Sequence, residues 1–177
     1  MIAIYCSKKL EVFFSNIISQ TSQNPTNYFG NWVGRLIIEK RRKILIFTNE
    51  KTAYTLIFSK VKKDIIKNIN SLFIDKFINQ LKFDIGITEK QEQQIRNEYN
   101  EIVFFQTNNN KSIVGTMNEF VSIIKFDHFV KYGNYTLDDT KLASKLNDYL
   151  NGSKLELNKN KYFTPKNLMQ ELLVQYV

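Results

Sequence analysis

Three runs of β-branched and aromatic residues stand close together in the first third of the chain. They span residues 31–39, 43–48 and 53–59, and short polar segments separate them. Runs of this kind with turn residues between them are typical of strands joined by tight turns. The pattern therefore predicts a three-stranded antiparallel meander over residues 31–59. Two shorter apolar runs, residues 2–6 and 101–106, predict two further strands.

Apolar residues that recur every three or four positions predict helices elsewhere in the chain. The longest such segment covers residues 61–83, and a later one covers residues 117–131. Thr88, with Gln91 three residues later, is typical of a capping box that opens a helix. Together the elements predict an α+β fold, a small and mostly antiparallel sheet covered by about five helices, largely on one face.

The composition predicts a single domain over residues 1–177. Hydrophobic residues make up 43% of the chain and aromatic residues 14%, which excludes general disorder and allows a substantial core. Cys6 is the only cysteine, so no intramolecular disulfide can form and a reducing compartment is expected. No segment approaches the apolar run that a membrane-spanning helix needs. These features predict a cytoplasmic protein.

Positive charge is concentrated in the stretch from Arg35 to Lys67. This stretch holds ten Lys and Arg residues against three acidic ones, whereas the whole chain has a net charge of +8. Because the strands of a meander alternate in direction, residues 40–43 and 60–63 should lie at the same end of it. The residues predicted to bind a partner are Arg35, Lys40, Arg41, Arg42, Lys43, Lys60, Lys62, Lys63 and Lys67.

This basic stretch predicts an acidic partner, which is either a nucleic acid, with RNA favoured, or a nucleoprotein complex. Arg41 and Arg42 stand out because arginine makes bidentate contacts to phosphate that lysine cannot make. Two interpretations stay open for the aromatic residues of the meander. Rings that face outward would stack on bases, and rings that face inward would belong to the core. These residues are Trp32, Phe47, Tyr54 and Phe58.

Candidate catalytic residues are few. His128 is the only histidine, and the structural interpretation of Cys6 and His128 is favoured over a catalytic dyad. The only acidic pair, Asp138-Asp139, stands at a predicted helix start, where acidic residues favour the helix dipole. The chain has neither a Gly-Lys-Ser/Thr motif nor a G-x-G-x-x-G motif. The sequence therefore predicts no catalytic site, no metal site and no cofactor.

Several segments, taken in order, resemble a known family. They are residues 6–10 (Cys-Ser-Lys-Lys-Leu), Asn31-Trp32, residues 41–49, Thr52-x-Tyr54-Thr-Leu56, residues 111–118, Leu146-Asn147 and residues 165–173. Through them the chain resembles a family of small, uncharacterised bacterial proteins classed only as a domain of unknown function. The resemblance covers nearly the whole chain. It implies a short α+β protein of plasmid or mobile-element type, and it supplies no activity.

The same segments contain polar residues that have no obvious place in a core. Short polar side chains suit turns and caps. Alternatively, they line a small cleft where the meander meets the segment from Ser112 to Asn118. The residues of this possible cleft are Asn31, Trp32, Asn49, Ser112 and Asn118.

The leading hypothesis is a non-enzymatic binding protein that engages nucleic acid or a nucleoprotein through residues 35–67. A concrete version, which rests on the implied mobile-element setting, is an anti-CRISPR-like inhibitor of an RNA-guided defence nuclease. One alternative is an enzyme of unrecognised type, such as a nuclease or a transferase. Another is an antitoxin-like partner of one cognate protein. Salt sensitivity separates the first hypothesis from the last, because contacts to phosphates weaken steeply as salt rises.

Overall fold

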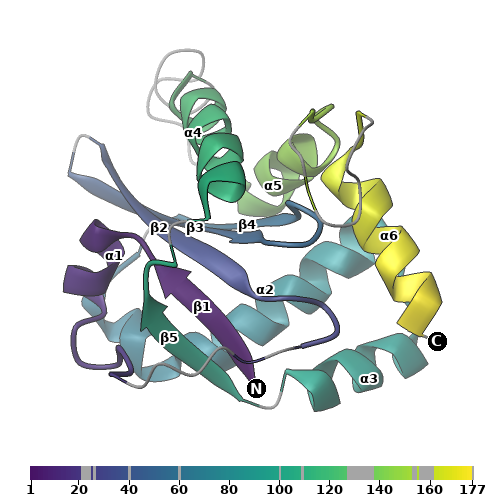
Figure 1. Ribbon diagram of the computed structural model, residues 1–177, viewed down its shortest axis with the longest axis horizontal. Coiled ribbons are helices and arrows are strands. Elements are labelled where there is room, and N and C mark those ends of the chain that lie inside the picture. Colours follow the sequence, from purple (N-terminus) through teal and green to yellow (C-terminus); the bar gives the residue numbers. More distant parts are fainter. Residues whose placement is uncertain are drawn as a thin grey trace.

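The computed structural model describes residues 1–20, 25, 27–39, 41–59, 61–99, 101–108, 110–126, 138–152, 155 and 162–176 (Figure 1). Five strands form one sheet in the order β4-β3-β2-β1-β5. They are β1 (Ile2–Cys6), β2 (Trp32–Glu39), β3 (Arg42–Asn49), β4 (Thr55–Phe58) and β5 (Ile102–Gln106). The α+β class and the meander are confirmed.

The sheet is mixed because β1 lies inside it. β2 and β3 pair antiparallel with Glu39 opposite Arg42, and β3 and β4 also pair antiparallel. β1 runs parallel to both of its neighbours, β2 and β5. The apolar runs at residues 2–6 and 101–106 predict these two strands, but a run of apolar residues carries no information about its partner.

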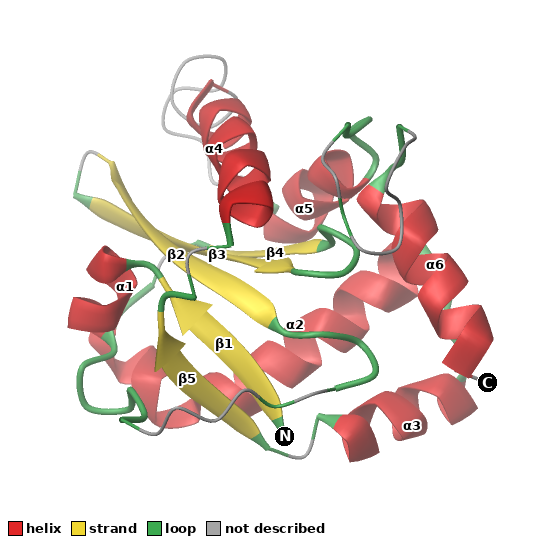
Figure 2. Ribbon diagram, viewed as in Figure 1, coloured by secondary structure: helices red, strands yellow, loops and turns green. Residues whose placement is uncertain are grey.

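Helices surround the sheet in the described part of the chain (Figure 2). They are α1 (Lys8–Phe13), the 3₁₀ helix Lys63–Asn68, α2 (Ile69–Asp84), α3 (Glu89–Glu98), α4 (Lys111–Lys125), α5 (Asp139–Asn147) and α6 (Pro165–Tyr176). The capping box of Thr88 and Gln91 is confirmed at the start of α3. α4 begins earlier than predicted because the Asn110 side chain caps it by accepting a hydrogen bond from Ile113 N.

Helices cover both faces of the sheet, which corrects the expectation that they lie largely on one face (Figure 1). α1, α2 and α3 pack on one face around a core that includes Leu10 and Phe73. α4 and α5 pack on the other face around Phe120 and Leu146, and α6 contributes to both cores. The reason lies in the strands, since Ile44–Phe47 is an unbroken buried run, and such a strand needs cover on both faces.

A side chain of α5 pairs with the edge of β4. Asn147 is fully buried, and its Oδ1 accepts a hydrogen bond from Thr55 N at 2.8 Å. Its Nδ2 donates to Thr55 O at 3.2 Å and to Asp84 Oδ2 at 3.1 Å. The same carboxylate oxygen accepts from the hydroxyl of Tyr54 at 2.6 Å. The edge of the sheet is thereby tied to α5 and to the end of α2, and the main-chain N–H and C=O of Thr55 are satisfied.

The chain leaves the two adjacent parallel strands toward opposite faces of the sheet. β1 is followed by α1, whose Leu10 belongs to the core on one face, and β5 is followed by α4, whose Met117 belongs to the core on the other. Where connections diverge in this way at the carboxyl ends of parallel strands, they leave a crevice in which open α/β sheets commonly bind ligands. The fold therefore positions a site between the start of α1, the end of β5 and α4.

Candidate functional site

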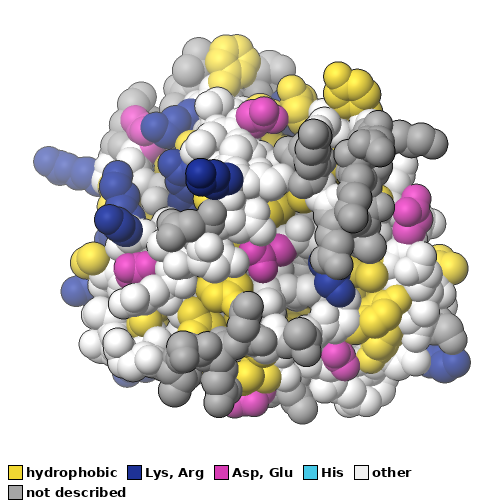
Figure 3. Space-filling view, viewed as in Figure 1, with side chains coloured by type: hydrophobic (Ala, Val, Ile, Leu, Met, Phe, Trp, Pro, Cys, Tyr) yellow, Lys and Arg dark blue, Asp and Glu magenta, His cyan; other side chains and the backbone are white. Residues whose placement is uncertain are grey.

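The two basic runs of the meander lie at the same end of the sheet. The β2–β3 hairpin turns between Glu39 and Arg42, and Val61 N donates to Lys43 O at 3.3 Å directly after β4. Figure 3 shows Lys and Arg side chains gathered at the upper left, where this hairpin lies. We define the basic pole as the exposed residues of these two runs that the structure describes, Arg41, Arg42, Lys62 and Lys63. Lys67 is also exposed, but it lies further along the 3₁₀ helix and lines a separate pocket with Ile102 and Phe104 of β5.

The cations of the basic pole form no ion pair with any residue that the structure describes. Arg96, the one arginine outside residues 35–67, is different. It contacts Asp75 at 2.9 Å and Glu92 at 3.0 Å, and the pKa of the Glu92 carboxyl is lowered by hydrogen bonds from Lys82 and Arg96. The charge of Arg96 on α3 is thus neutralised locally, whereas the cations of the basic pole have no ion-pair partner among the described residues.

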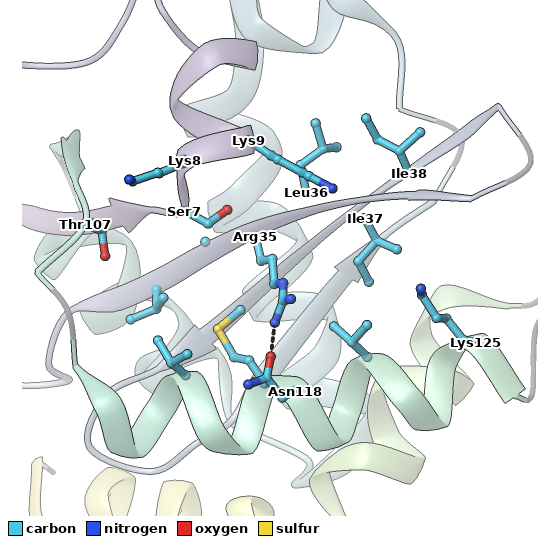
Figure 4. A pocket seen from close by; sticks show the side chains of 15 residues that line it. Ser7, Lys8, Lys9, Arg35, Leu36, Ile37, Ile38, Thr107, Asn118 and Lys125 are labelled. Carbon is cyan, nitrogen blue, oxygen red and sulfur yellow. Dashed lines mark hydrogen bonds between the residues drawn. The ribbon is translucent and has the colours of Figure 1, made fainter.

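Some residues of the basic stretch lie away from the basic pole. Arg35 points from β2 toward α4, where it donates a hydrogen bond to Asn118 Oδ1 (Figure 4). Lys43 is half-buried and lies over the ring of Phe13, with 5.7 Å between Nζ and the ring centroid. Lys51 lies at the opposite end of the meander and donates to Tyr28 O at 2.8 Å. Lys40 and Lys60 lie outside the described residues.

The aromatic residues of the meander belong to the core, so the base-stacking interpretation is wrong for them. Trp32, Phe47 and Tyr54 are fully buried, and Phe58 is 9% exposed. The Trp32 ring packs edge-on against Phe73 at a centroid distance of 5.1 Å. Alternation along the strands directs these rings toward α2, which leaves phosphate contacts as the means by which the basic pole could hold a nucleic acid.

Arg41 has a backbone conformation that long side chains rarely adopt. Its φ is 67°, in the left-handed region that costs most residues about 1 kcal/mol or more and suits glycine. We expect Arg41→Gly to leave the free energy of unfolding unchanged or to raise it by up to about 1 kcal/mol in urea denaturation. Arg42→Gly, which lies within β3, should instead lower it by about 0.5–1 kcal/mol. An equal loss in both variants would contradict this account of the hairpin.

Three of the five predicted cleft residues support the sheet instead. Asn31 Oδ1 accepts a hydrogen bond from Ala3 N at 3.3 Å. Asn49 is fully buried, and its Oδ1 accepts from Thr52 N at 3.1 Å in the turn after β3. Trp32 lies in the core. These are the turn and capping roles that short polar side chains favour, and they remove the three residues from the predicted cleft.

A pocket of about 460 Å³ lies where β2 meets α4, and Asn118 is one of its lining residues (Figure 4). Ser112 lies in the first turn of α4 and is not a lining residue. The lining residues come from the start of α1, from β2, from the end of β5 and from one stripe of α4. They are Ser7, Lys8, Lys9, Val33, Gly34, Arg35, Leu36, Ile37, Ile38, Thr107, Val114, Met117, Asn118, Val121 and Lys125.

The described residues that line the pocket include four basic side chains and no carboxylate. Its cations are Lys8, Lys9, Arg35 and Lys125, of which Lys125 also contacts Glu39 at 3.2 Å. Sequence reasoning selected Arg35 and Asn118 but missed Lys8, Lys9 and Lys125. The signal that could have found the first two is their position directly after a buried strand, where ligand-binding side chains of α/β sheets gather.

The candidate catalytic residues do not converge on this pocket. Asp138 caps α5 by accepting hydrogen bonds from the main-chain N–H groups of Thr140 and Lys141, and Asp139 accepts one from Ser59 N at 2.8 Å. His128 lies outside the described residues. Among the described residues, no group of three His, Cys, Asp or Glu side chains could hold a metal ion.

Cys6 is fully buried at the end of β1, and burial raises the pKa of its thiol, with a smaller contribution from the charge of Glu11. Since the thiolate is the reactive form, we expect the native protein to resist thiol reagents such as 5,5′-dithiobis(2-nitrobenzoic acid) at neutral pH. In denaturant the same thiol should react fully and at once. Rapid labelling of the native protein would contradict this placement.

The chain was compared with protein families, curated proteins and solved structures. A family model described as "Domain of unknown function (DUF6933)" matches residues 3–168. No curated protein and no solved structure matches the chain. No helix in the described residues is long and apolar enough to span a membrane.

Proposed function

Since the chain belongs to the DUF6933 family, a domain of unknown function, we propose its function from its own surface. The protein is a non-enzymatic binding protein that engages the phosphates of RNA through the basic pole. The observation that carries this proposal is the group of exposed cations at one end of the meander that no described acidic residue pairs with. Surface cations without an ion-pair partner break no protein contact when they meet phosphates. Their contacts release counterions that had condensed on the nucleic acid, which favours binding.

The chemistry of the basic pole favours a nucleic acid over a protein partner. The centres of protein interfaces are depleted in lysine and rich in exposed aromatic residues. The basic pole is made of lysine and arginine, and the aromatic residues of the meander are buried. Interfaces with nucleic acids are strongly positive and polar, which matches this surface. Binding should then be nearly independent of base sequence, because phosphates carry no sequence information.

Fluorescence anisotropy with labelled single-stranded RNAs of unrelated sequence tests the proposal. We expect similar affinities for each sequence and a steep loss of affinity as salt rises. If all four cations of the basic pole contact phosphates, the slope of log K against log salt should be about −2.8. An affinity for RNA that is undetectable at low salt would contradict the proposal.

A finer form of the proposal places the RNA within a nucleoprotein, such as an RNA-guided defence nuclease that the protein would inhibit. Capture of the tagged protein from its host, with and without nuclease treatment, distinguishes the two forms. Recovery of an RNA-guided nuclease, lost when its guide is digested, would support inhibition through the guide. Recovery of one protein that resists both nuclease and high salt would favour an antitoxin-like partner instead.

A further inference from the structure

Two polar side chains of the pocket between β2 and α4 have unused hydrogen-bonding capacity. The Oγ of Ser7 is buried and has no hydrogen-bond partner among the described residues. Arg35 is half-buried and forms no ion pair with a described residue, and its bond to Asn118 goes to a neutral amide through Nη1. Buried polar groups normally have partners, and a half-buried guanidinium normally meets an anion. The Ser7 hydroxyl is therefore available to a polar ligand, and the Arg35 guanidinium favours an anionic one.

The surrounding charge also favours an anion. Lys8 and Lys9 lie at the start of α1, and Lys125 lies across the pocket near the end of α4 (Figure 4). Two described acidic groups contact lining residues. Glu39 lies 3.2 Å from the ammonium of Lys125, and Glu11 accepts a hydrogen bond from the main-chain N–H of Thr107 at 3.0 Å. A ligand with a single negative charge would leave most of this charge uncompensated, whereas a phosphate monoester carries close to two charges at neutral pH.

Aliphatic side chains of α4 and β2 also line the pocket. Val114, Met117 and Val121 are spaced to lie on one stripe of α4, and Met117 and Val121 pack in the same core as Val33 and Ile37 of β2. A pocket of about 460 Å³ is within the range of small-molecule sites and exceeds the size of a bare phosphate ion. The occupant should therefore combine an anionic group with a larger body that can pack on aliphatic side chains.

We propose that this pocket binds a nucleoside phosphate, with the phosphate group held by Ser7, Arg35 and the neighbouring lysines and the nucleoside against the apolar stripe of α4. Its location, at the carboxyl ends of β1 and β5 where their connections diverge, is the usual place for such ligands in open α/β sheets. A free mononucleotide and the phosphorylated end of an RNA strand share this chemistry. The inference goes beyond RNA binding by the basic pole and does not depend on it.

Isothermal titration calorimetry with the full chain tests the inference. The probes are adenosine monophosphate, adenosine, inorganic phosphate, and one short RNA with either a 5′-phosphate or a 5′-hydroxyl. We expect the monophosphate to bind at one site, inorganic phosphate to bind more weakly, and adenosine not to bind. A preference for the 5′-phosphorylated RNA over the 5′-hydroxyl RNA would identify a strand end as the source. Equal binding of the two RNAs, together with binding of the monophosphate, would identify a small metabolite.

Substitutions in the pocket should change the affinity for the monophosphate in opposite directions. Arg35→Gln should weaken binding of the monophosphate roughly 10- to 100-fold, because it removes a charge-assisted contact. Val114→Trp should block the pocket without a change of charge, and it lies at a partly exposed position that tolerates a larger side chain. Glu39→Gln should tighten binding, since it removes a negative charge that contacts the lining and releases Lys125.

The control variant is Lys67→Gln, an exposed cation that belongs neither to the basic pole nor to the lining of this pocket, and it should bind the monophosphate as the native chain does. If Arg35→Gln and Val114→Trp bound the monophosphate as tightly as the native chain does, the inference would be overturned, because the phosphate would then bind elsewhere on the basic surface. No heat with the monophosphate in a folded native chain would overturn it as well. RNA binding that is lost in basic-pole variants and kept in Val114→Trp would show that the two sites act separately.

Discussion

Replacement of Arg41, Arg42 and Lys63 by glutamine in one variant is expected to weaken RNA binding at least roughly tenfold at moderate salt, and to do so equally for every sequence. The three side chains are exposed and form no ion pair with a described residue, so their removal costs the fold little. Circular dichroism and urea denaturation should match those of the native chain. Lys43 is left in place because it packs over Phe13.

The matched control removes three charges outside the basic pole, by replacing Lys90, Lys111 and Lys166 with glutamine. These lysines are on α3, at the start of α4 and on α6. α4 is 15 residues long, so Lys111 lies about 20 Å from the helix end that contacts Glu39. The control should keep most of the affinity. Equal losses in the two triple variants would mean that net charge alone drives binding, which would contradict a localised site.

Asn147→Ala is expected to lower the free energy of unfolding by about 2–4 kcal/mol. The substitution leaves the buried N–H and C=O of Thr55 without their partners and removes a hydrogen bond to the Asp84 carboxylate. A buried polar group that loses its partner costs about 1–3 kcal/mol. The midpoint of urea denaturation should fall with little change in slope, because the same surface is exposed on unfolding.

Asn97→Ala provides the comparison for this variant. Asn97 is exposed on α3 and accepts one hydrogen bond from Gln93, so its loss should change the free energy of unfolding by no more than about 0.5 kcal/mol. If Asn147→Ala were as mild as Asn97→Ala, the edge of β4 would not depend on the α5 side chain. The network of Asp84, Tyr54 and Asn147 would then contribute little to stability.

The meander and the capped start of α3 could be predicted because their signals are local. Apolar runs with turn residues between them specify neighbouring antiparallel strands, and Thr88 with Gln91 specifies a helix start within four residues. The parallel pairing of β1 with β2 and β5 could not be predicted, since no local pattern records which strand lies beside which. For the same reason, the sequence did not reveal that helices cover both faces of the sheet.

The candidate site was only partly predictable for a related reason. Arg41 and Arg42 stand out in a chain with few arginines, and strand alternation brings them to the same end as Lys62 and Lys63. The pocket instead gathers single residues from elements far apart in sequence, such as Lys8 and Lys125. Asn147 stands in one of the segments that resemble the family. Its pairing with the edge of β4 could not be predicted, because it depends on tertiary packing.

The salt dependence of RNA binding by the native chain and by the variant of Arg41, Arg42 and Lys63 tests the central claim most directly. Anisotropy titrations between 50 and 200 mM salt would give the slope of log K against log salt for each protein. If the three side chains contact phosphates, the variant slope should be smaller by about 2, since each lost contact to a single strand contributes about 0.7. Identical slopes in the two proteins would show that the basic pole does not touch the RNA.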